Sequence, residues 1–204
     1  SPRDLALSNS GLRAITTNFR SDDVSFVALD EGAEREGRLK PGATLVEAST
    51  GNTAIALALV ARQKGYRLVV VVPEGVPPTI RDILQLCGVE IVWAPPVAGM
   101  RGAIDLASEL AERHGYHPVN QFKDPCNIRT HYETTGLEIA ASLPRIDAFV
   151  AGIGTGGTIM GVARRLRETH PEAKILGIEP RMGERLQGLR CLADAYAAPL
   201  LDLD

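Results

Sequence analysis

The chain has 204 residues, 45% of them hydrophobic and 23% charged, a composition that excludes a disordered or fibrous protein. Its 22 basic and 25 acidic residues give a net charge of -3 without a basic run, so we expect no nucleic-acid partner. No apolar run reaches the roughly 20 residues that a membrane span needs, and no signal-peptide pattern opens the chain. Three widely separated cysteines indicate reduced thiols, which favours a cytoplasmic protein.

Along the chain, strands and helices are predicted to alternate after an N-terminal stretch, residues 1–26, that has no sustained period and stays unassigned. A helix is predicted over residues 27–37, where Gly37 ends it, and Pro41 with Gly42 predicts a turn. The predicted strands are residues 43–48, 67–73, 89–95, 146–153 and 173–180. The predicted helices are residues 52–65, 79–88, 100–115, 127–143 and 157–170.

The predicted strands are continuous apolar runs, as a parallel sheet covered by helices on both faces requires. Repetition of strand and helix indicates an α/β fold with open parallel sheets and right-handed crossovers. Residues 183–204 have no clear period and end without a closing element, so we expect the fold to be truncated.

The glycine-rich loop at residues 152–158 lies between a predicted strand and a predicted helix, where α/β proteins bind ligands. Its glycines allow a close approach of the backbone, and the helix start offers unpaired N–H groups and a favourable dipole to an anion. Thr155 and Thr158 add hydroxyl donors. The loop therefore predicts a phosphate site, although a plain glycine-rich connection is the simpler alternative.

A dinucleotide site is a second interpretation of the same loop. Gly152, Gly154 and Gly157 fit the spacing G-x-G-x-x-G, and the next predicted strand leads to Glu179, which could hold a ribose hydroxyl. The motif lies late in the chain, however, and this interpretation leaves the loop at residues 48–53 unexplained.

The loop at residues 48–53 carries four small polar side chains around Gly51 at a helix start: Ser49, Thr50, Asn52 and Thr53. Hydroxyls and backbone N–H groups of this kind can bind a carboxylate. An ordinary helix N-cap is the alternative, but a cap needs only one such residue.

Together, STGNTAIALALVARQKGYR and the later GTGGTIMGV resemble the cysteine synthase family. Further matching stretches are GRLKPGATLVEAS, NQFKDPCN, HYETTGLEI and IDAFVAGIGTGGT. The resemblance implies fold type II, pyridoxal phosphate as cofactor, and replacement of the β-substituent of an activated serine by a sulfide donor to give cysteine. It also implies a smaller α/β domain at residues 27–128 with the substrate loop, and part of a larger domain at residues 129–204 with the cofactor phosphate loop.

The resemblance assigns roles to individual residues. The cofactor phosphate is expected at Gly154, Thr155, Gly156, Gly157 and Thr158, and the pyridoxal ring beside Asn52. The substrate carboxylate is expected at Ser49, Thr50, Thr53 and Gln121. Arg190 matches the arginine that binds a substrate phosphate in the branch using O-phosphoserine, and a solvated surface arginine is the alternative.

One essential family residue has no counterpart in this chain. Counting back from Asn52 by the family spacing, the lysine that carries the cofactor falls on Asp22. The four lysines are elsewhere: Lys40, Lys64, Lys123 and Lys174. The family's C-terminal third is also missing, so the chain is expected to be incomplete at both ends. We predict impaired activity and, at most, non-covalent cofactor binding.

The resemblance further implies an amino-acid substrate, a sulfide donor and a homodimer, with no metal. Two alternatives stay open. One is a non-catalytic remnant that binds an anion or a partner protein, and the other is a protein that binds NAD or FAD.

Overall fold

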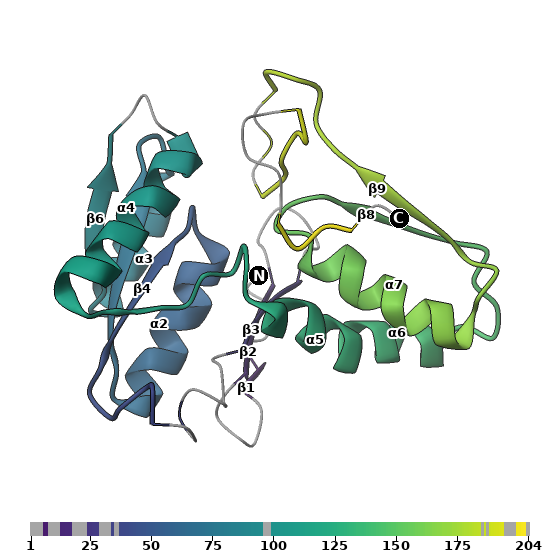
Figure 1. Ribbon diagram of the computed structural model, residues 1–204, viewed down its shortest axis with the longest axis horizontal. Helices are drawn as coiled ribbons and strands as arrows, with labels where there is room; N and C mark the ends of the chain where they lie inside the picture. Colours follow the sequence, from purple (N-terminus) through teal and green to yellow (C-terminus); the bar gives the residue numbers. More distant parts are fainter. Residues whose placement is uncertain are drawn as a thin grey trace. The chain divides into compact units, whose positions relative to one another are not determined.

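The computed structural model describes residues 6–7, 13–17, 24–28, 34, 37–95, 99–184, 186, 188–193 and 199–202 (Figure 1). The chain divides into two compact units, Ser1–Asn120 and Gln121–Asp204, and each unit is considered by itself. The domain border predicted between residues 128 and 129 falls inside helix α5 (Pro125–Glu133) of the second unit.

The first unit opens with a three-stranded antiparallel sheet in the order β1 (Ala6–Leu7), β2 (Arg13–Thr17) and β3 (Val24–Ala28). The helix predicted from residue 27 is wrong at its start, because residues 27 and 28 end β3. The run VSFVA is rich in β-branched and aromatic side chains, which favour a strand. Most of the remaining predicted helix, and Asp22 before it, lie outside the described residues.

A parallel sheet forms the centre of the first unit, in the order β6 (Glu90–Ala94), β5 (Arg67–Pro73), β4 (Thr44–Ala48) and β7 (His117–Pro118). Helices α2 (Asn52–Lys64), α3 (Pro78–Leu86) and α4 (Gly99–His114) connect these strands. The parallel pairing and these helices were predicted. The short strand β7 was not.

The core of the first unit lies on both faces of β4 and β5, as the continuous apolar runs predict. Leu45, Val70 and Val72 pack with Leu57 of α2 and Leu84 of α3, and each is at most 2% exposed. The alternate residues of the same strands, among them Val46, Val69 and Val71, are equally buried on the other face, where α4 lies beside β4 and β5.

The second unit is built around helix α7 (Gly157–Thr169), which connects the parallel strands β8 (Ala148–Gly152) and β9 (Lys174–Ile178). Helices α5 and α6 (Thr135–Ser142) pack against α7. Ile159, Met160, Val162 and Leu166 of α7 form the core of this unit. The far face of the sheet exposes apolar side chains, with Leu176 49% and Ile178 54% exposed.

The single helix predicted over residues 127–143 is in fact two helices. They meet at Thr134, whose backbone has φ -121° and ψ -82°. Thr134 donates both its N–H and its hydroxyl to the carbonyl of Thr130, so its own side chain competes with the helix. Gly136 lies inside α6, where a Cβ would approach the Cβ of Arg165 to 2.8 Å.

After β9, the described residues contain turns but neither helix nor strand. Among the described helices, none combines the length and the apolar character that crossing a membrane requires.

Candidate functional site

The glycine-rich loop lies where the sequence places it, between the end of β8 and the start of α7. Gly156 has φ 88° and turns the chain into the helix through the left-handed region, which glycine adopts without strain. The first backbone hydrogen bond of the helix runs from Met160 to the carbonyl of Gly156. The amides of Thr158 and Ile159 therefore precede the intrahelical ladder and point out of the positive end of α7.

Two further glycines let neighbouring groups approach this loop. A Cβ at Gly154 would collide with the carbonyl oxygen of Gly188, and a Cβ at Gly157 would collide with the side chain of Asn127. The close packing explains why the loop is so rich in glycine.

Thr155 is held by Asn127 of α5. The Nδ2 of Asn127 donates to Thr155 Oγ1 at 2.9 Å and to the backbone carbonyl of Gln121 at 2.9 Å. The backbone N–H of Gly157 also donates to Thr155 Oγ1, at 3.3 Å. Both contacts use lone pairs of the Thr155 oxygen, which leaves its hydroxyl proton to donate elsewhere.

Thr158 is held by His131, which also belongs to α5. Its Oγ1 lies 3.2 Å from the Nε2 of His131, and the Nδ1 of the same ring lies 3.0 Å from the Oγ1 of Thr135. His131 is only 4% exposed, and burial lowers its pKa to about 4. The ring is therefore uncharged at neutral pH, with one nitrogen that donates and one that accepts.

The structure places Gln121 and Arg190 near this loop. Gln121 contacts Asn127 through its backbone carbonyl, while Arg190 donates its backbone N–H to the carbonyl of Ile153 at 2.8 Å. The guanidinium of Arg190 lies 5.1 Å from the centre of the Phe122 ring, and the side chain is half-buried rather than fully solvated. Its role in binding a substrate phosphate stays a prediction.

The polar loop of the first unit joins β4 to α2. Ser49 is 4% exposed, and its Oγ accepts the backbone N–H groups of Gly51 and Ala54, both at 3.2 Å. Ser49 thus performs the capping function that Gly51, the residue before α2, lacks. Thr50 of this loop is half-buried, as are Asn52 and Thr53 at the start of α2. Their roles with a carboxylate or a pyridoxal ring stay predictions.

The four lysines differ in their surroundings. Lys64 is paired with Glu34 at 2.8 Å, whereas Lys40, Lys123 and Lys174 are exposed.

Three polar residues beside these loops were not identified from the sequence: Asn127, His131 and Glu47. Glu47 is 2% exposed at the end of β4, and its Oε1 accepts the N–H of Ala48 at 2.9 Å. A charged residue inside an otherwise apolar strand was a signal for it. The signal for the other two was the spacing of Gly157 and Gly161 on one face of α7, which indicates a closely packed neighbour.

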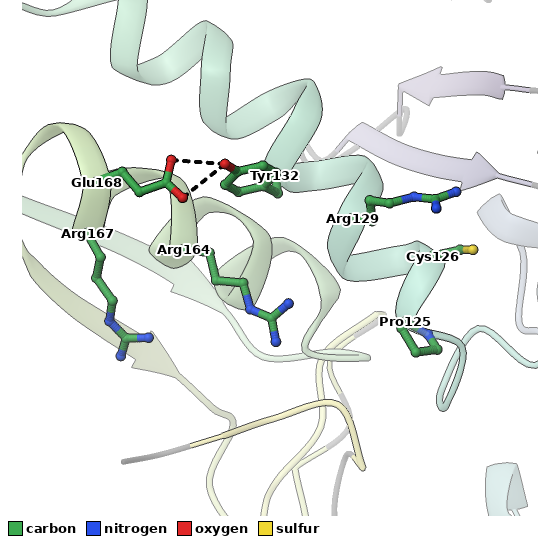
Figure 2. A pocket seen from close by; sticks show the side chains of 7 residues that line it. All are labelled: Pro125, Cys126, Arg129, Tyr132, Arg164, Arg167 and Glu168. Atoms are coloured by element: carbon green, nitrogen blue, oxygen red, sulfur yellow. Dashed lines mark hydrogen bonds between the residues drawn. The ribbon is translucent and has the colours of Figure 1, made fainter.

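A separate hollow of about 610 Å³ lies on the surface of the second unit, between α5 and α7. Figure 2 shows Tyr132 of α5 directed at Glu168 of α7, and the Tyr132 hydroxyl donates to both carboxylate oxygens at 2.9 Å. This hydrogen bond raises the pKa of Tyr132. The hollow contains none of the predicted site residues. It is lined by Pro125, Cys126, Arg129, Tyr132, Arg164, Arg167 and Glu168. Within the described residues, His, Cys, Asp and Glu do not gather in any group that could hold a metal ion.

Comparison with known proteins identifies the family. Residues 22–199 match the family described as "Pyridoxal-phosphate dependent enzyme". A cysteine synthase from Staphylococcus aureus (strain Mu50) is 44% identical over 164 residues, which cover 79% of this chain and 53% of the relative. A cysteine synthase from a Flavobacterium is 39% identical over 187 residues, 87% of this chain and 61% of the relative.

Comparison with solved structures points to the same family. The crystal structure of O-ureido-L-serine synthase has a TM-score of 0.78 at 37% identity, covering 84% of this chain and 57% of the other. A hydrogen sulfide-producing enzyme from Fusobacterium nucleatum has a TM-score of 0.77 at 26% identity, covering 94% and 67%. The chain belongs to the family of pyridoxal-phosphate-dependent enzymes, with the fold type II architecture of its neighbours. It spans about half the length of the first cysteine synthase compared.

Membership favours the cysteine synthase interpretation of the glycine-rich loop over the dinucleotide alternative. Glu179, the residue that alternative needs, accepts the backbone N–H of Leu192 with its carboxylate.

The residues of the loop fit the phosphate of the family cofactor. Free amides at the start of α7, the hydroxyl proton of Thr155 and the glycine backbone supply donors for phosphate oxygens. The glycines at 154 and 157 serve the packing of the loop, because a Cβ there would meet the carbonyl oxygen of Gly188 or the side chain of Asn127.

Proposed function

We propose that this chain carries the cofactor-phosphate and substrate loops of a cysteine synthase-type enzyme, which replaces the β-substituent of an activated serine with a sulfide. The observation that carries the proposal is the loop from Gly154 to Thr158, in which the start of α7 and a free Thr155 proton meet at one point. Identity of 44% to a cysteine synthase supports the same chemistry.

In this proposal the chain's own residues bind and orient. Pyridoxal phosphate, when bound, supplies an electron sink for the α-carbon of an amino acid. The loop Gly154–Thr158 holds its phosphate and Asn52 contacts its ring. Ser49 accepts two amides through its oxygen, so its hydroxyl proton stays available for a substrate carboxylate beside Thr50 and Thr53. Gln121 assists at the carboxylate, and Arg190 binds the phosphate when O-phosphoserine is the substrate.

Binding of inorganic phosphate and of pyridoxal phosphate to the 204-residue chain tests the loop. In the double variant Thr155→Val, Thr158→Val, we expect affinity for both to fall by about tenfold to one-hundredfold, the loss expected for hydrogen bonds to a charged group. Thr169→Val, at the opposite end of α7, is the matched control and should bind like the wild type. Equal affinity in all three proteins would contradict the phosphate site.

We further propose that the cofactor binds without a covalent bond, because Asp22 occupies the family's lysine position and a carboxylate cannot form an imine. Borohydride reduction of the protein with pyridoxal phosphate, followed by peptide mapping, should leave no stoichiometrically labelled lysine. The chain should also not make cysteine at a rate typical of the family. Labelling of Lys123, with cysteine formation that disappears in Lys123→Ala, would contradict this proposal.

Asp22 also favours a second candidate function, an anion-binding protein without turnover. The variant Asp22→Lys tests the first function against the second, because a gain of cysteine formation would support the enzyme over the binder.

We also propose a cytoplasmic homodimer. Cys87, Cys126 and Cys191 are not joined in disulfides, which suits a reducing compartment. Sedimentation equilibrium of the purified chain measures its oligomeric state.

A further inference from the structure

The two threonines of the glycine-rich loop differ in how their hydroxyl protons are directed. The orientation of the Asn127 amide is fixed, because the nitrogen that contacts Thr155 also contacts the carbonyl of Gln121, which can only accept. Thr155 therefore accepts from Asn127 and keeps its own proton for a ligand.

For Thr158 the direction depends on His131. If the Nε2 of His131 carries the proton, Thr158 accepts from it at 3.2 Å and keeps its own proton to donate. If the Nδ1 carries the proton, Thr158 donates to Nε2 and has none left for a ligand. The partner of Nδ1 is the hydroxyl of Thr135, 3.0 Å away, which can either donate or accept.

A charged imidazolium, with protons on both nitrogens, does not enter this comparison of the two tautomers. His131 is 4% exposed, and burial lowers its pKa to about 4. At neutral pH the ring is uncharged, so the position of its single N–H proton decides what Thr158 can do.

We propose that His131 is a positioning residue of the phosphate loop: Thr135 donates to Nδ1, Nε2–H donates to Thr158, and Thr158 thereby directs its hydroxyl proton at the bound anion. This inference rests on the proposed function of the loop. A consequence follows from linkage. Because only the Nε2–H form gives the loop its second hydroxyl donor, an anion that binds there selects that tautomer.

Two variants of His131 test the direction of the hydrogen bond. The amide nitrogen of His131→Gln can reach the position of Nε2, whereas the shorter side chain of His131→Asn reaches only the position of Nδ1. By calorimetry with inorganic phosphate and with pyridoxal phosphate, we expect His131→Asn to weaken binding by about tenfold or more and His131→Gln by about threefold at most. In a Thr158→Val background, His131→Asn should have no further effect.

The tautomer can be read in the wild-type protein by the ¹⁵N chemical shifts of the His131 ring, with and without inorganic phosphate. We expect the Nε2–H form in the complex. If either variant of His131 fails to fold, Thr135→Val is used in its place. In this variant the His131 ring stays in place but loses the donor to its Nδ1, and the affinity for phosphate should fall.

The outcomes separate this inference from the function on which it rests. A phosphate complex with the Nδ1–H form, or additive effects of His131→Asn and Thr158→Val, would overturn the role of His131 and leave the phosphate site standing. If the wild type binds neither phosphate nor pyridoxal phosphate, both proposals are wrong.

Discussion

Acid should destabilise the second unit through His131. In the unfolded chain this residue titrates near its ordinary pKa of 6.5, whereas burial lowers the pKa in the folded state to about 4. Between these values the unfolded chain binds more protons than the folded one, so the free energy of unfolding falls as the pH is lowered. At roughly 1.4 kcal/mol per pH unit, a pKa lowered from 6.5 to about 4 corresponds to a loss of about 3 kcal/mol.

The loss of unfolding free energy is complete only below the pKa of folded His131, and it is absent above the pKa of His131 in the unfolded chain. The assay is urea unfolding followed by NMR signals of α7 residues such as Val162 and Leu166, which lie in the core of the second unit. Fluorescence is unsuitable, because the single tryptophan, Trp93, belongs to the first unit. The comparison is between the wild type, His131→Gln and the control His114→Gln, which changes an exposed histidine of the first unit.

The wild type and His114→Gln should both lose about 3 kcal/mol more than His131→Gln between neutral pH and pH of about 4, since carboxylate titration is common to all three. Parallel pH profiles for the wild type and His131→Gln would refute the reasoning. So would an NMR titration in which folded His131 changes charge near 6.5.

Three further predictions concern packing and charge. Gly161→Ala should destabilise the second unit by about 3 kcal/mol, because a Cβ there would lie 2.5 Å from the Cβ of His131; urea unfolding of α7 measures it. Leu57→Ala removes a fully buried side chain from the first unit and should cost about 3 kcal/mol, read by Trp93 fluorescence. Burial and a hydrogen bond to Glu34 raise the pKa of Tyr66 to about 12; in Glu34→Gln it should move part of the way toward 10.0, as phenolate absorbance would report.

The parts of the fold that the sequence predicts well are those with strong local signals. The run RLVVVVP is β5 with the predicted bounds, and Gly65, with φ 74°, ends α2 as expected. Elements without such signals were missed. Strand β7 has two residues, one of them proline, and exists only because it pairs with β4. The break at Thr134, where the backbone has φ -121° and ψ -82°, is concealed by the helical pattern of residues 127–143.

The candidate site divides in the same way. The glycine-rich loop can be recognised in the sequence by its spacing. Where neighbouring groups approach the backbone closely, only glycine has no Cβ to clash with them. Asn127 and His131 carry no such local mark, since they lie in α5 and are separated from the loop by helix α6 and strand β8. Only the packing of α5 on α7 brings them to Thr155 and Thr158.

The packing of α5 on α7 also explains why Asn127 and His131 reach the loop together. Asn127 and His131 are four residues apart and so lie on one face of α5, while Gly157 and Gly161 are four apart on the facing side of α7. A Cβ at Gly157 would meet Asn127, and one at Gly161 would meet His131 and the carbonyl of Ile128. The two glycines on α7 therefore let α5 approach closely enough for the Asn127 amide to reach Thr155 and the His131 imidazole to reach Thr158. One helix–helix contact thus sets the donor direction of Thr155 and offers the means to set that of Thr158, so a change that separates α5 from α7 should weaken both hydroxyl contacts to an anion together.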